Sequence, residues 1–176
     1  MDDSCDRCLQ MLATALEKEI KGAEFYRDAM AKCSNQVGKE LFRCLMADEG
    51  IHIKRVKQIY ESLHRGQPWS ETWKSEAPSE DLNKLTKKRI TELGAAVTAD
   101  TNDMEALKIG IQMEQGAINF YEDQLKKASN PLESEFIKCM IAEERTHFQA
   151  LEDVILYFTD PESWYIEKER PPIDGA

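Results

Sequence analysis

Two stretches of the sequence each place a glutamate and a histidine one helical turn apart, Glu49 with His52 and Glu144 with His147. The stretches read Met46-Ala-Asp-Glu-Gly-Ile-His52 and Ile141-Ala-Glu-Glu-Arg-Thr-His147. Residues three apart on a helix share a face, and the apolar residues around both pairs turn that face toward the core. A buried carboxylate without a partner costs free energy or takes up a proton. We therefore expect cations to meet these side chains.

The two stretches belong to a longer internal repeat with an offset of 95 residues and no gap. Each half contains a glutamate, a tyrosine seven residues later, and the Glu-x-x-His motif thirty residues after the first glutamate. The matched positions include Glu19 and Glu114, Phe25-Tyr26 and Phe120-Tyr121, Ser34-Asn35 and Ser129-Asn130, Cys44 and Cys139, Glu49 and Glu144, and His52 and His147. Such self-similarity predicts two copies of one helical hairpin.

Apolar residues at helical spacing predict an all-α protein with four long helices. We expect them to run from near Cys5 to Lys32, from Asn35 to about Arg65, from Thr101 through Leu125, and from Asn130 to about Phe158. Asn35 and Asn130 are expected helix N-caps, the second followed by a proline at the first helical position. The predicted domain is a four-helix bundle over residues 1–158, with repeats at about 9–65 and 104–158 and an extended C-terminal tail at 159–176 held by Trp164 and Tyr165.

Residues from about 66 to 100 interrupt the helical pattern and form the predicted crossover between the hairpins. A loop opens at Gly66–Trp69 and a second break lies at Ala77–Ser79, after which Ser79 or Asp81 would cap a further helix through Glu92. A crossover of this length runs along the bundle and makes the second and third helices parallel. Trp69 and Trp73 are expected either to cover a flank of the bundle or to face a partner subunit.

Four helices thus each deliver one central carboxylate, and two of them also deliver an imidazole. The six predicted metal ligands are Glu19, Glu49, His52, Glu114, Glu144 and His147. Four carboxylates are neutralised by two divalent cations, and mixed carboxylate and imidazole ligation suits iron or manganese better than structural zinc. We expect Glu49 and Glu144 to bridge the two ions, Glu19 and Glu114 to be terminal, and one histidine to bind each ion.

Tyr26 and Tyr121 share the inward faces of the ligand-bearing helices. They are expected either to hydrogen-bond a ligand carboxylate or to fill the core as aromatic side chains.

The composition fits a cytoplasmic globular domain, with 176 residues, 41% hydrophobic residues and 32% charged residues. A net charge of −10 argues against nucleic acid or an anionic membrane as partner. No apolar run is long enough for a membrane span, and the first residues lack the pattern of a signal peptide. The five cysteines are not spaced as a disulfide framework, and Cys5 with Cys8 forms only half of a metal or redox motif.

One glutamate from each of two helices and Glu-x-x-His from each of two others is the ligand pattern of ferritin-like dimetal bundles. Through these residues and the Phe25-Tyr26 and Phe120-Tyr121 pairs, residues 5–158 resemble the rubrerythrin and ferritin-like superfamily, most of all stand-alone rubrerythrin-related proteins. The resemblance implies a non-haem centre of two iron ions that reacts with peroxide or dioxygen.

Several positions depart from the rubrerythrin pattern. No cysteine follows Cys139, so electrons would come from an external, rubredoxin-like donor rather than from a rubredoxin module. Ala117 and His147 stand where rubrerythrin has glutamates, which makes the ligand set more similar to that of bacterioferritin. Gly50 replaces the methionine that binds haem in bacterioferritin, so no haem is expected.

The resulting functional hypothesis is a homodimeric di-iron oxidoreductase that removes peroxide or dioxygen under oxidative stress. The alternatives are an iron-binding or storage protein with a ferroxidase-like site, and a metal-stabilised bundle without turnover. A storage function would require a large multi-subunit shell, which gel filtration distinguishes from a dimer.

Overall fold

A computed structural model describes residues 3–76, 81–93 and 99–169. In these ranges the chain is helical throughout its regular structure and contains no strand. The elements are α1 (Asp3–Lys32), α2 (Gln36–His64), the 3-10 helix η1 (Thr72–Ser75), α3 (Leu82–Leu93), α4 (Thr101–Leu125), α5 (Pro131–Thr159) and α6 (Pro161–Glu169). The predicted all-α bundle is confirmed. No helix in the described ranges has an apolar stretch long enough to span a bilayer.

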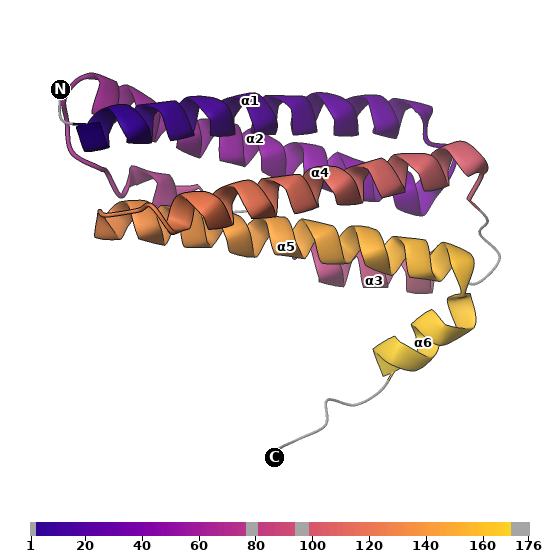
Figure 1. The fold of residues 1–176 in the computed structure, drawn as a ribbon. Coiled ribbons are helices and arrows are strands. Elements are labelled where there is room, and N and C mark those ends of the chain that lie inside the picture. The colour runs from indigo at the N-terminus through magenta and orange to yellow at the C-terminus, as the bar shows by residue number, and fades with distance from the viewer. Residues whose placement is uncertain (1–2, 77–80, 94–98, 170–176) are drawn as a thin grey trace, which may run out of the picture.

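Helices α1 and α2 form one antiparallel hairpin, and α4 and α5 form the other (Figure 1). The Asn35 side chain caps α2 by accepting the backbone N–H groups of Val37 at 2.7 Å and Gly38 at 3.2 Å. At the matched position Asn130 accepts the Leu132 N–H at 2.8 Å. The two N-caps predicted from the repeat therefore begin the second helix of each hairpin.

The crossover covers one flank of the bundle. Trp69 and Trp73 are buried and pack against Phe136 of α5, with ring centroids 6.1 Å and 5.4 Å apart. Of the two alternatives predicted for these tryptophans, the structure shows the first: they cover a flank of the bundle. The predicted break at 77–79, with Ser79 as a possible cap, lies outside the described residues, whereas Asp81 caps α3 by accepting the Lys84 N–H at 3.2 Å.

The chain then returns to the end of the bundle where α2 begins. Asp103, in the first turn of α4, accepts the backbone N–H groups of Ser34 and Asn35, each at 3.1 Å. Because α2 and α4 begin side by side, these two helices run parallel, as the length of the crossover predicts.

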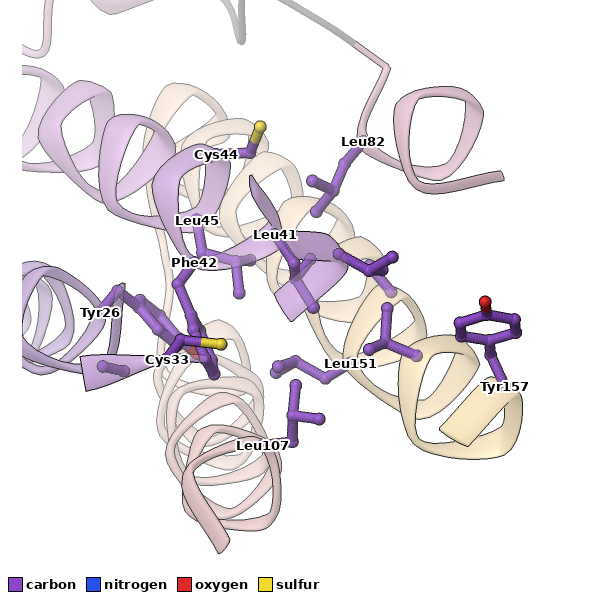
Figure 2. Close-up of a cluster of buried hydrophobic side chains, with 14 of the residues drawn as sticks. Tyr26, Cys33, Leu41, Phe42, Cys44, Leu45, Leu82, Leu107, Leu151 and Tyr157 are labelled. Atoms are coloured by element: carbon purple, nitrogen blue, oxygen red, sulfur yellow. The ribbon is translucent and has the colours of Figure 1, made fainter. Parts of the chain in front are cut away.

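The core consists of two apolar clusters separated by polar side chains. One cluster includes Tyr26, Leu45, Leu107 and Leu151 (Figure 2). The other includes the following buried residues: Leu12, Val56, Tyr121, Phe136 and Met140. On each long helix the predicted ligands fall between the two clusters in sequence. The bundle therefore surrounds its polar centre with apolar packing on both sides.

The prediction of an extended tail from residue 159 is wrong for Pro161–Glu169, which form α6. The Asp160 side chain accepts the Ser163 N–H at 3.0 Å and Pro161 occupies the first helical position, so an ordinary helix start was present in the sequence. Trp164 is buried and packs edge-on against Tyr157 at 5.8 Å, which docks α6 on the bundle. Residues 170–176 lie outside the described part of the chain.

Candidate metal centre

The structure brings all six predicted side chains into the middle of the bundle, each at most 3% exposed. They form two overlapping groups whose potential ligand atoms lie within 4.8 Å of one another. One group is Glu49, Glu114, Glu144 and His147, and the other is Glu19, Glu49 and His52. Glu49 belongs to both groups, so the cluster has room for two cations that share this carboxylate.

Glu144 lies between the two imidazoles. Its Oε1 atom is 3.3 Å from Nδ1 of His52, and its Oε2 atom is 3.4 Å from Nδ1 of His147. Each oxygen therefore faces a different histidine, as a bridging carboxylate would. The assignment of Glu49 and Glu144 as bridges and of Glu19 and Glu114 as terminal ligands stays a prediction.

The opposite nitrogen of each imidazole faces a carboxylate from the other hairpin. Nε2–H of His52 donates to Oε2 of Glu143 at 2.9 Å, and Nε2 of His147 lies 3.4 Å from Oδ2 of Asp48. Because a carboxylate only accepts, these contacts hold a proton on each Nε2, and a metal ion among the ligand carboxylates would bind the imidazoles through Nδ1 in place of a proton.

Glu143 and Asp48 were not among the site residues predicted from the sequence. Both precede a Glu-x-x-His glutamate and occupy matched positions of the repeat, which was the available signal.

Each tyrosine hydrogen-bonds a ligand carboxylate, and it does so across the hairpins. The Tyr121 hydroxyl donates to Glu19 at 2.5 Å, and the Tyr26 hydroxyl donates to Glu114. Seven residues along a helix span about 10 Å, which takes each tyrosine beyond the glutamate of its own helix. Since α1 and α4 run antiparallel, that displacement brings each tyrosine level with the other helix's glutamate. The tyrosines thereby join the two hairpins at the centre.

The electrostatics of the cluster show an excess of buried negative charge. Burial and the nearby Glu19 carboxylate raise the pKa of Glu49 well above its usual value, and burial and Glu144 raise the pKa of Glu114 to about 7. Burial alone would also raise the pKa of Glu144, but His52 and His147 hold it well below its usual range. In the absence of metal, protons on neighbouring groups thus substitute for part of the missing positive charge.

The pattern of unsatisfied atoms fits bound cations. Glu49 Oε2, both Glu144 carboxylate oxygens and His147 Nδ1 are buried and make no hydrogen bond, although the Glu144 oxygens lie at ion-pair distance from the two imidazoles. A buried polar atom left without any partner costs about 1–3 kcal/mol. All four belong to predicted ligands and lie where the ligand atoms converge. A pair of divalent cations would satisfy them together.

The family model for rubrerythrin matches residues 10–155. The chain belongs to the rubrerythrin family. Comparison with curated proteins and with solved structures found no match. Family membership indicates a di-iron carboxylate protein, and the buried glutamate and histidine cluster fits such a centre.

The rubrerythrin-family centre opens toward a pocket of about 260 Å³ between α1 and α4. Glu19, Glu49 and Glu114 line its buried side, and the exposed Lys21 lies at its rim. Gly22 also lines it, and a Cβ atom at this position would lie only 3.0 Å from Cδ of Glu49. The pocket gives a small molecule access to the carboxylates from the side opposite the helices that bear the histidines.

The cysteines are outside the centre. None of the five cysteines, all of which lie in the described ranges, forms a disulfide, and neither group of potential metal ligands there contains a cysteine. Cys8 and Cys44 are buried, whereas Cys139 is partly exposed beside Glu143. The Cys5 and Cys8 pair therefore adds no ligand to the di-iron candidate.

Proposed function

We propose that this rubrerythrin-family protein is a non-haem di-iron oxidoreductase that reduces hydrogen peroxide or dioxygen with electrons from an external donor. The observation that carries the proposal is the convergence of four carboxylates and two imidazoles around unsatisfied buried atoms, beside a pocket that reaches them. An apolar core with incidental polar residues gives no reason for both features together.

The side chains divide into groups with separate tasks. Glu19 and His52 would hold one iron ion and Glu114 and His147 the other, with the carboxylates of Glu49 and Glu144 shared between them. When bound, the two ferrous ions supply the two electrons that reduce one peroxide molecule, with two protons, to two water molecules.

The residues around the ligands would keep this arrangement in place. Tyr121 and Tyr26 orient the carboxylates of Glu19 and Glu114 through their hydroxyl groups. Asp48 and Glu143 hold the histidines with Nδ1 toward the centre. The pocket between α1 and α4 admits an oxidant of a few atoms while the surrounding helices exclude bulk water.

Oxidised iron must be reduced again for turnover. Both groups of potential metal ligands found in the described ranges belong to this one centre. We therefore propose that a separate, rubredoxin-like carrier supplies the electrons. We further propose that the active form is a homodimer.

The test is a stopped-flow measurement on protein loaded with ferrous iron under anaerobic conditions. We expect two iron ions per chain and oxidation of both by one equivalent of hydrogen peroxide, followed by turnover with reduced rubredoxin. A variant with both His52→Ala and His147→Ala serves as the control that lacks the imidazoles. Absence of peroxide-dependent oxidation in the loaded wild-type protein contradicts the proposal, and a large shell in gel filtration would instead favour iron storage.

A further inference from the structure

The two imidazoles have unequal surroundings although the repeat supplies both. Glu143 and Asp48 occupy matched positions, but the buried Arg55 next to Glu143 is matched by Ala150 in the second hairpin. The difference therefore lies outside the six ligands, in the residues that hold the histidines.

Arg55 links three parts of the molecule. Its Nη1 atom lies 2.5 Å from Oε2 of Glu143, the same oxygen that accepts the His52 Nε2–H at 2.9 Å. Its Nε–H donates at 2.8 Å to the backbone carbonyl of Glu76 in the crossover, which also accepts a hydrogen bond from Nη2. At 3% exposure the guanidinium is held on both sides by these contacts.

The carboxylate on the other histidine has no comparable support. Asp48 lies 3.4 Å from Nε2 of His147, and none of the described lysine and arginine side chains forms an ion pair with it. Both Asp48 and Glu143 line the same hollow of about 400 Å³, so the difference between the two carboxylates is the guanidinium of Arg55. The orientation of His147 is therefore less constrained than that of His52.

We propose that Arg55 is a positioning residue that makes the two cation positions unequal: by fixing Glu143 it orients His52, so that the position formed by Glu19, Glu49 and His52 binds its divalent cation more tightly than the position formed by Glu114, Glu144 and His147. The inference rests on the proposed di-iron centre. A carboxylate hydrogen-bonded to the distal nitrogen of a ligating histidine fixes the ring and raises its basicity, and the loss of such a partner typically weakens metal binding 10- to 100-fold. Arg55 acts through Glu143, because it holds the carboxylate that in turn holds the His52 ring.

The inequality has a consequence for metal exchange. At limiting metal the protein would hold one cation beside His52, and the position beside His147 would fill last and empty first. Because Arg55 is also bound to the carbonyl of Glu76, the crossover helps to define the geometry of the tighter position.

The experiment is a titration of the metal-free full-length protein with Co(II), followed by visible absorbance and by NMR of the paramagnetically shifted imidazole N–H protons. The wild type should show two steps, and the N–H proton that appears in the first step should exchange slowly with solvent. Arg55→Met should weaken only the first step, by about 10- to 100-fold, and speed the exchange of that one proton. Arg55→Lys, which keeps the charge, should restore part of both effects.

Two further variants complete the design. Asp48→Asn should weaken only the second step, and Glu143→Gln should weaken the first, which keeps the test decisive if Arg55→Met does not fold. The inference is overturned if Arg55→Met or Glu143→Gln affects both steps equally or neither, or if the wild type binds both ions in one indistinguishable step. Absence of Co(II) binding would refute the metal centre itself, whereas equal steps in a protein that still reacts with peroxide would refute only the role of Arg55.

Discussion

Gly22 is the position at which a single added carbon should disturb the metal centre most directly. It lies on α1 beside Glu49, and a Cβ atom there would be 3.0 Å from Cδ and 3.1 Å and 3.3 Å from the two carboxylate oxygens. Non-bonded carbon atoms are most stable about 3.5–4.0 Å apart, so Gly22→Ala requires a displacement of about 0.5–1 Å. Backbone movement within a packed helix is costly, and the Glu49 side chain would therefore move.

The displacement has different consequences with and without metal. Alanine improves the helix by about 0.5–1 kcal/mol relative to glycine, while crowding in a packed site costs about 1–3 kcal/mol, so the metal-free variant should be destabilised by no more than about 2.5 kcal/mol. Ligand distances in metal sites tolerate only about 0.2 Å of error. Since Glu49 belongs to both ligand groups, we expect both cations to bind at least 10-fold more weakly in Gly22→Ala.

Calorimetric titration with Co(II) and urea unfolding of the metal-free protein measure the two effects separately. The matched control is Gly116→Ala, because Gly116 lines the same pocket on α4 and a Cβ atom there would have no neighbour within 4 Å. This control should gain about 0.5–1 kcal/mol of stability and keep wild-type metal affinity. Wild-type binding of both ions by Gly22→Ala would refute the view that Glu49 ligates them from its present position.

Three further predictions concern the surroundings of the centre. Tyr121→Phe removes the donor to Glu19 and should lower the unfolding free energy of the metal-free protein by about 1–3 kcal/mol in urea, whereas no change would mean that the hydroxyl contributes nothing. Burial alone would raise the pKa of Asp103, but hydrogen bonds from Ser34 and Asn35 hold it below its usual value, so the carboxylate stabilises the fold above about pH 4 and this contribution is lost as the pH falls through the folded pKa. Asp103→Asn should thus cost about 1–2 kcal/mol in urea unfolding at pH 7 and less at pH 3, and an equal cost at both pH values would contradict this account. Trp164→Ala should release α6, seen as fast amide exchange confined to that helix, and unchanged protection there would show that Trp164 does not hold it.

The helices and the six central side chains could be predicted because their signals are local or repeated. Apolar spacing defines the inward face of each helix, and Asn35 and Asn130 mark helix starts by side-chain chemistry that depends on the next few residues alone. The gapless repeat strengthens the prediction of the six central side chains. A buried Glu-x-x-His motif costs stability unless it has a function, and here it occurs twice at the same register.

The residues that hold the ligands could not be identified in this way. Asp48 and Glu143 adjoin the inward glutamates on helices rich in charge, where an acidic residue usually faces solvent. Their role depends on where the opposite hairpin places a histidine, which is a property of helix packing. The crossed tyrosine contacts have the same origin, since they follow from the antiparallel alignment of α1 and α4 rather than from spacing along either helix.

Charge neutrality constrains the six ligand residues of the centre but not the residues around them. The four carboxylates and two imidazoles must remain together, because removing one from either hairpin leaves the buried charge unbalanced. The outer residues carry no such constraint, and there the halves differ: Arg55 is matched by Ala150, and Gly22 by Ala117. Arg55 contacts the partner of His52 and so acts on the cation position that uses α1 and α2, whereas Gly22 borders Glu49, which belongs to both ligand groups. A duplicated hairpin can thereby keep a symmetric set of ligands and still give its two metal ions different affinities.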